Sequence, residues 1–144
     1  MRIDGLWYLC DDGVVRPVFQ SEVMTAAGAW VKVPFLVDTG ADRTVFSGDV
    51  LNTLQLGVMQ TADRLVGAGG EIDSIIVETE IRLTQDDSAR AVFRGHFAGC
   101  ANLEALDMSV LGRDILNLFA VIVDRPGDLV CLLSPRHFYE IGTR

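Results

Sequence analysis

Asp38-Thr39-Gly40-Ala41 is the segment of this 144-residue chain whose residue types could carry out chemistry. It follows the apolar run 33–37, which is typical of a buried strand, and Gly40 frees the backbone to turn directly afterwards. A carboxylate at the end of such a strand is partly desolvated, which disfavours its charged form unless a partner compensates. Two symmetry-related copies of Asp38, about 3 Å apart, would share one proton and act on a substrate as general base and general acid. The chain contains one such segment, so this arrangement needs two chains.

The composition indicates one domain built mainly of strands. A chain of 144 residues with 49% hydrophobic content fits a single globular domain over 1–144. Its 14 Gly, only 4 Pro and many β-branched residues favour short strands joined by turns over a helical bundle. We therefore expect an all-β fold.

Charge and cysteine usage exclude several classes of function. The net charge is -8 and the basic residues are scattered among acids, so nucleic-acid binding has no electrostatic support. Cys10, Cys100 and Cys131 are odd in number and far apart, which predicts buried apolar cysteines in a reducing compartment rather than disulfides or a zinc site. No metal-ligand spacing is present, so we expect neither a metal nor another cofactor.

The N-terminal residues do not resemble a targeting sequence. Acidic residues stand where a signal peptide carries its apolar core, and no run approaches the roughly 18 apolar residues of a membrane helix. We expect a soluble cytoplasmic protein without a membrane segment, or the soluble part of a tethered one.

Strands that alternate with turns account for most of the sequence pattern. Turn signals at 11–13, 26–28 and 85–88 separate apolar-rich stretches, and residues 77–83 alternate between apolar and charged side chains. The expected strands are 6–9, 14–24, 29–37, 64–68, 71–83, 91–97, 120–123 and 129–133, with a further apolar stretch at 110–112.

Short helices are expected between these strands. Capping residues at 47–49 precede an apolar pattern over 50–56 that stops at Gly57, which predicts a helix of about two turns. Residues 113–119 are a second candidate, and the tail from Ser134 to Tyr139 is a third.

Three segments in the expected order make the chain resemble the retropepsin family, the dimeric single-domain aspartic peptidases of retroviruses and their bacterial relatives. Residues 35–46 are similar to the catalytic loop of that family, with Asp-Thr-Gly-Ala after an apolar strand. Residues 66–70 resemble the glycine-rich tip of the hairpin, called the flap, that closes over substrate. Residues 109–116 match the Leu-Gly-Arg-Asp segment after the penultimate strand. The resemblance covers a core of about 29–133.

This resemblance implies a retropepsin-like acid protease fold: a closed β-barrel or sandwich with a flap hairpin and one or two short helices, active as a homodimer. It implies that Asp38 is the catalytic carboxylate, that Thr39 bonds across the dimer beneath the two carboxylates, and that Gly40 and Ala41 face the substrate backbone. It also implies that Asp42 supports the substrate main chain and pairs with Arg113, which, with Asp114, ties the catalytic loop to the terminal helix. The flap residues that would bind peptide are Gly67, Ala68, Gly69 and Gly70.

Each of these assignments has a plainer alternative. Asp42 and Arg113 can form a stabilising ion pair with or without contact to substrate, and the glycines of 67–70 can form an ordinary turn. Ala68 departs from the larger apolar residue usual at the flap tip. His96 and His137 have no nucleophile or carboxylate arranged around them, so they are expected to be structural.

The favoured hypothesis is an aspartic endopeptidase that hydrolyses an extended polypeptide without a covalent intermediate. Its side-chain pockets are expected to be apolar and to favour bulky hydrophobic substrate residues beside the cleaved bond. The alternative is a retropepsin-like domain retained as a dimerisation or peptide-binding module with negligible turnover. Either terminus could build the dimer interface, and the acidic pair Asp11-Asp12 is expected to be a solvated turn.

Overall fold

The computed structural model describes residues 1–61, 65–67, 70–72, 74–102, 104–134 and 140–142 of the chain. Six strands close into a barrel, in which β3 pairs with β4 on one side and with β9 on the other. Around the barrel the order is β3-β4-β11-β5-β10-β9, and the pairs Glu22–Arg82 and Val23–Ile81 complete the ring. These strands are β3 (Val15–Met24), β4 (Trp30–Val37), β5 (Val45–Phe46), β9 (Ser74–Thr84), β10 (Arg90–Cys100) and β11 (Ser109–Leu111).

The interior of the barrel is filled by side chains that alternate along these strands. Phe46 is fully buried, and its ring lies 5.7 Å from that of Phe35 and 6.0 Å from that of Phe97, at tilted and edge-on angles that aromatic pairs favour. On β9 the buried residues Val77, Ile81 and Leu83 alternate with charged ones, as their period of two predicts. The predicted all-β fold is therefore confirmed.

Two short strands extend the barrel sheet, and two others form a separate two-stranded sheet. β2 (Leu6–Leu9) pairs with β3, and β6 (Gln60–Thr61), which the sequence pattern did not predict, pairs with β9. β7 (Leu65–Gly67) and β8 (Gly70–Ile72) form a separate hairpin in which Gly67 pairs with Gly70. The predicted hairpin is thus present, but the expected strand 71–83 consists of β8 and the separate β9.

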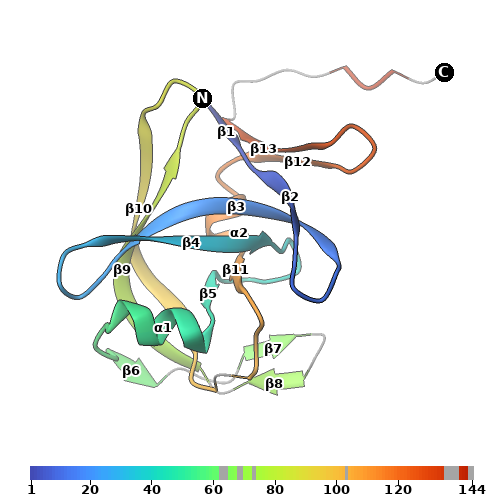
Figure 1. Cartoon of the computed structure of the whole chain (residues 1–144). Coiled ribbons are helices and arrows are strands. Elements are labelled where there is room, and N and C mark those ends of the chain that lie inside the picture. The colour runs from blue at the N-terminus through green and yellow to red at the C-terminus, as the bar shows by residue number, and fades with distance from the viewer. Residues whose placement is uncertain (62–64, 68–69, 73, 103, 135–139, 143–144) are drawn as a thin grey trace.

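A three-stranded sheet joins the two ends of the chain. β13 (Leu129–Leu133) lies between β12 (Ala120–Asp124) and β1 (Arg2–Asp4), above the barrel in the view of Figure 1. Ile3 on β1 is buried opposite Leu132. The N-terminal segment therefore pairs within its own chain, an arrangement that the sequence pattern left open.

The first helix has the predicted length of about two turns but lies two residues earlier, and the second is shorter than predicted. α1 (Gly48–Leu54) ends at Gln55, which takes a left-handed conformation with φ 54°, so the helix stops two residues before Gly57. α2 (Arg113–Leu116) is followed by single turns in which Leu118 and Phe119 donate to carbonyls three residues back. The predicted tail helix falls on residues 135–139, which lie outside the described part of the chain.

Candidate active site

The position of β11 shapes the loop that carries Asp38. Val110 of β11 pairs in parallel with Leu36 of β4 and antiparallel with Val45 of β5, so β11 separates the two strands that the loop connects. The chain that leaves β4 must therefore pass around the end of β11 before it enters β5. The amide of Asp38 donates to the carbonyl of Leu111 at 3.1 Å, which fixes the start of this loop on β11.

The carboxylate of Asp38 is held by the backbone of its own loop. The amide of Gly40 donates to Asp38 Oδ1 at 3.0 Å, and the amide of Ala41 donates to the carbonyl of Asp38 at 3.2 Å. Asp38 is half-buried, whereas Thr39 and Gly40 are exposed. Within the described residues Oδ2 accepts no hydrogen bond, so it can meet a water molecule or a second carboxylate.

The first turn of α2 holds the second half of the loop. The amide of Arg113 donates to the carbonyl of Ala41 at 2.8 Å, and that of Asp114 donates to the carbonyl of Asp42 at 3.2 Å. The side chains of Asp42 and Arg113 form an ion pair, with 80% of the Asp42 side chain exposed. Because exposed pairs contribute roughly 0–1 kcal/mol, the backbone bonds supply more of the rigidity than the ion pair.

Buried Thr44 and exposed Asp114 form a part-buried hydrogen-bonded connection between the loop and α2. The carboxylate of Asp114 accepts from the amide of Thr44 at 2.9 Å, from Thr44 Oγ1 at 2.7 Å and from the amide of Ile115 at 2.9 Å. Thr44 Oγ1 in turn accepts from the amide of Gly112 at 3.1 Å, and Thr44 is fully buried. One hydroxyl therefore links the loop, β11 and α2.

Replacing Thr44 with valine is expected to lower the free energy of unfolding by about 2 kcal/mol, because the amide of Gly112 and the carboxylate of Asp114 each lose a buried partner. Urea unfolding of the variant measures this loss. Thr53→Val is the matched control, since Thr53 is exposed on α1 and bonds only to the carbonyl of Asp49 at 3.2 Å. Equal stability of the two variants would show that the connection contributes nothing.

The close packing of the loop leaves no room for a side chain at position 112. A Cβ atom on Gly112 would lie 2.3 Å from the carbonyl carbon and oxygen of Arg43. The φ of Gly112 is -96°, which any residue adopts, so the requirement for glycine is steric. The Leu-Gly-Arg-Asp segment is thus fitted directly against the loop 38–44.

The structure brings most of the predicted site residues together. Asp38, Thr39, Gly40, Ala41 and Asp42 form one loop, which is bound to Arg113 and Asp114. Gly67 and Gly70 pair in the separate hairpin, while Ala68, Gly69 and also His137 lie outside the described residues. His96 is exposed on β10.

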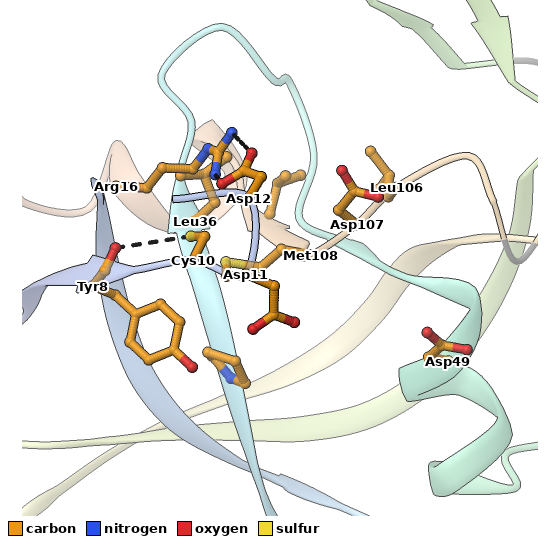
Figure 2. Close-up of a pocket in the computed structure, with 12 residues that line it drawn as sticks. Tyr8, Cys10, Asp11, Asp12, Arg16, Leu36, Asp49, Leu106, Asp107 and Met108 are labelled. Atoms are coloured by element: carbon orange, nitrogen blue, oxygen red, sulfur yellow. Dashed lines mark hydrogen bonds and ion pairs between the residues drawn. The ribbon is translucent and has the colours of Figure 1, made fainter. Parts of the chain in front are cut away.

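A cavity of about 660 Å³ is lined by residues of β4, of β11 and of the turn between β2 and β3, among them Leu36 (Figure 2). Leu36 and Asp38 are two residues apart on an extended strand end, so their side chains project to the same face, opposite Phe35 and Val37 in the core. Sequence reasoning missed this cavity, because its walls come from segments that are distant along the chain. Asp11, expected as part of a solvated turn, lines it.

The described residues contain no group of three or more His, Cys, Asp or Glu side chains placed to hold a metal ion. In the same part of the chain, neither helix has the length and apolar character needed to cross a membrane. Cys100 and Cys131 are buried, as predicted, whereas Cys10 is only half-buried.

The chain is similar to known aspartyl proteases in sequence and in fold. A model of the aspartyl protease family matches residues 23–115, more than half of the chain. The protease of EIAV, solved in complex with the inhibitor HBY-793, has 21% sequence identity and a TM-score of 0.54, with 71% of this chain and 86% of that chain covered. A retropepsin-like aspartic protease from Rickettsia conorii has 21% identity and a TM-score of 0.57, with 92% and 97% covered. A comparison with curated protein sequences gives no match.

At 21% identity the solved structures establish only the fold, whereas the match to the family model establishes the family to which the sequence belongs. The fold resembles theirs over most of the chain, and the matched region 23–115 includes both the Asp38 loop and the Arg113 segment that holds it. The chain therefore belongs to the aspartyl protease family and has a retropepsin-like fold.

Proposed function

We propose that this protein is an aspartic endopeptidase that works as a homodimer, with its active site formed by two copies of Asp38. The observation that carries the proposal is a carboxylate fixed on a rigid loop, with Oδ1 held by Gly40 and the loop bound to β11 and α2. Each chain supplies one such group, whereas acid and base catalysis by a carboxylate pair requires two.

In the proposed reaction the two carboxylates share one proton. The charged Asp38 takes a proton from a bridging water as the oxygen of that water attacks the carbonyl carbon of the peptide bond. The neutral Asp38 donates its proton to the carbonyl oxygen, which gives a tetrahedral diol. The Asp38 that took the proton from water then passes it to the amide nitrogen, while the other Asp38 takes a proton from a hydroxyl of the diol as the C–N bond breaks. A carboxylic acid and an amine leave without a covalent enzyme intermediate, and the pair again holds one proton.

The remaining site residues would position the substrate. Thr39, exposed beside Asp38, would bond to its counterpart in the second chain, and the backbone of Gly40 and Ala41 would face the extended peptide. Asp42, exposed and paired with Arg113, would accept from a main-chain amide of the substrate. The hairpin residues Gly67, Ala68, Gly69 and Gly70 would cover the peptide as a flap.

A dilution experiment tests the shared site. Peptide cleavage is measured from about pH 4 to about pH 7, while sedimentation velocity reports the dimer fraction in the same samples. Activity per chain should fall on dilution in proportion to the dimer fraction. Undiminished activity of a sample that sediments as monomer would exclude the shared site. Peptide binding without cleavage by the dimer would support a binding module instead.

A further inference from the structure

The cavity lined by Leu36 has an apolar floor. Pro34 and Leu36 of β4 and Val110 of β11 form the sheet side, and Leu106 and Met108 lie in the segment that leads into β11. Leu106 also packs against the cluster around Val110, so this wall is continuous with the buried structure. Such a floor can cover the methylene groups of a long side chain.

The rim of the same cavity is acidic. Asp11 belongs to the turn between β2 and β3, Asp107 to the segment before β11, and Asp49 to the first turn of α1. Figure 2 shows Asp11 and Asp107 flanking Met108 from two different chain segments. Within the described residues none of these three carboxylates forms an ion pair.

Among the described residues that line the cavity, the single basic one, Arg16, is already neutralised. Arg16 donates to both carboxylate oxygens of Asp12, at 2.9 Å and 2.7 Å. This hydrogen bonding by Arg16, together with the amide of Val14, lowers the pKa of Asp12 to about 2, so the pair remains charged but compensated at higher pH. Asp11, Asp49 and Asp107 therefore leave the cavity with an excess of negative charge.

We propose that this cavity is a substrate subsite that selects a side chain with a long apolar stem and a cationic end, as in lysine or arginine. The inference rests on the proposed peptidase function and names its substrate class. It replaces the expectation that the pockets favour purely hydrophobic residues, because the floor is apolar but the rim is not. A dimer has two such cavities, so the preference applies at one position on each side of the cleaved bond.

Pairs of peptides test the proposal. The two peptides of a pair differ at one position, where one carries lysine and the other carries norleucine, which has a similar stem and no charge. From one pair to the next, this position moves along the residues around the cleaved bond. Cleavage is measured as kcat/KM with the wild type, and binding by fluorescence anisotropy with Asp38→Asn. Lysine should be preferred by about fivefold at two symmetric positions, and added salt should reduce the preference, because the rim carboxylates are exposed.

The double variant Asp11→Asn with Asp107→Asn should remove most of this preference, because kcat/KM falls more for the lysine peptide than for the norleucine peptide. Asp128→Asn is the control for the loss of one negative charge elsewhere: it lies in a turn outside the cavity, where Asp128 has φ 53°, a conformation that asparagine tolerates. An unchanged preference in the double variant, or equal loss in the control, would overturn the proposal.

The outcomes separate the subsite from the peptidase function. Cleavage with no preference for lysine refutes the subsite and leaves the peptidase intact. Preferential binding of the lysine peptide to Asp38→Asn, lost in the double variant, supports the subsite even where the wild type cuts neither peptide. Absence of both cleavage and selective binding refutes both proposals.

Discussion

Asp38→Asn is expected to lower kcat/KM for peptide cleavage on the order of 10³-fold, because the amide can act neither as general base nor as general acid. The fold should be preserved, since the asparagine oxygen can accept the bond from Gly40 that Asp38 Oδ1 accepts at 3.0 Å. Initial rates with a fluorogenic peptide measure the loss, and thermal unfolding together with sedimentation checks that stability and association are unchanged.

A control with the same local geometry exists elsewhere in the chain. Asp87 Oδ1 accepts from the amide of Ala89 at 3.0 Å, also two residues ahead, in the exposed turn between β9 and β10. Asp87→Asn should therefore retain full activity. If Asp38→Asn cleaves peptide as fast as this control, the proposed mechanism is wrong.

Mixing the variant with the wild type tests the shared site directly. Random pairing at equal concentrations places about half of the wild-type chains in dimers with Asp38→Asn, which contain a single carboxylate. Activity per wild-type chain should then fall by about half once the subunits have exchanged, because one carboxylate cannot supply both roles. Unaffected activity would indicate that each chain works alone.

Gly112→Ala is expected to have the largest effect on stability. The added Cβ would meet the backbone of Arg43 at 2.3 Å, and backbone cannot rotate away as a flexible side chain can. Either β11 or the loop 38–44 must shift, so the free energy of unfolding should fall by about 3 kcal/mol or more. For a chain of this size the melting temperature should drop by roughly 10 °C, which calorimetry measures.

Gly95→Ala provides the comparison. Gly95 also lies on a barrel strand, β10, and a Cβ atom there would meet nothing within 4 Å. This substitution should leave stability unchanged or raise it by about 0.5 kcal/mol, because alanine restricts the unfolded chain. Similar melting temperatures for the two variants would contradict the steric argument.

The main strands were predictable because burial repeats every second residue along them. On β9 and β10 this alternation is set by contact with the core, and it predicts the end of β9 and the start of β10 to within one residue. The other two limits differ by three residues: β9 begins at Ser74 rather than at 71, and β10 continues past Phe97 to Cys100, where successive residues are all buried. β1 escaped prediction because Ile3 is its only buried residue and its partner strand, β13, lies at the other end of the chain. Strands this short carry too little local pattern to be recognised.

The site was predictable in its residues but not in its connections. The loop 38–42 and the Arg113 segment could be named, because their residue types and order match a known family. The bonds between Thr44 and Asp114 join residues 70 positions apart, and no local pattern reports them. The acidic rim was missed for the same reason, since Asp11 and Asp107 line the same cavity only after the chain has folded.

The placement of β11 in the barrel determines how late during synthesis the Asp38 loop can fold. β11 is the last barrel strand along the chain, yet it sits between β4 and β5, which come much earlier. During synthesis β4 and β5 must remain apart until residues 109–111 have left the ribosome, and contacts so distant in sequence form late. The Asp38 loop is therefore among the last parts of the protein to take shape, so an incomplete chain cannot yet hold the Asp38 carboxylate in its final geometry.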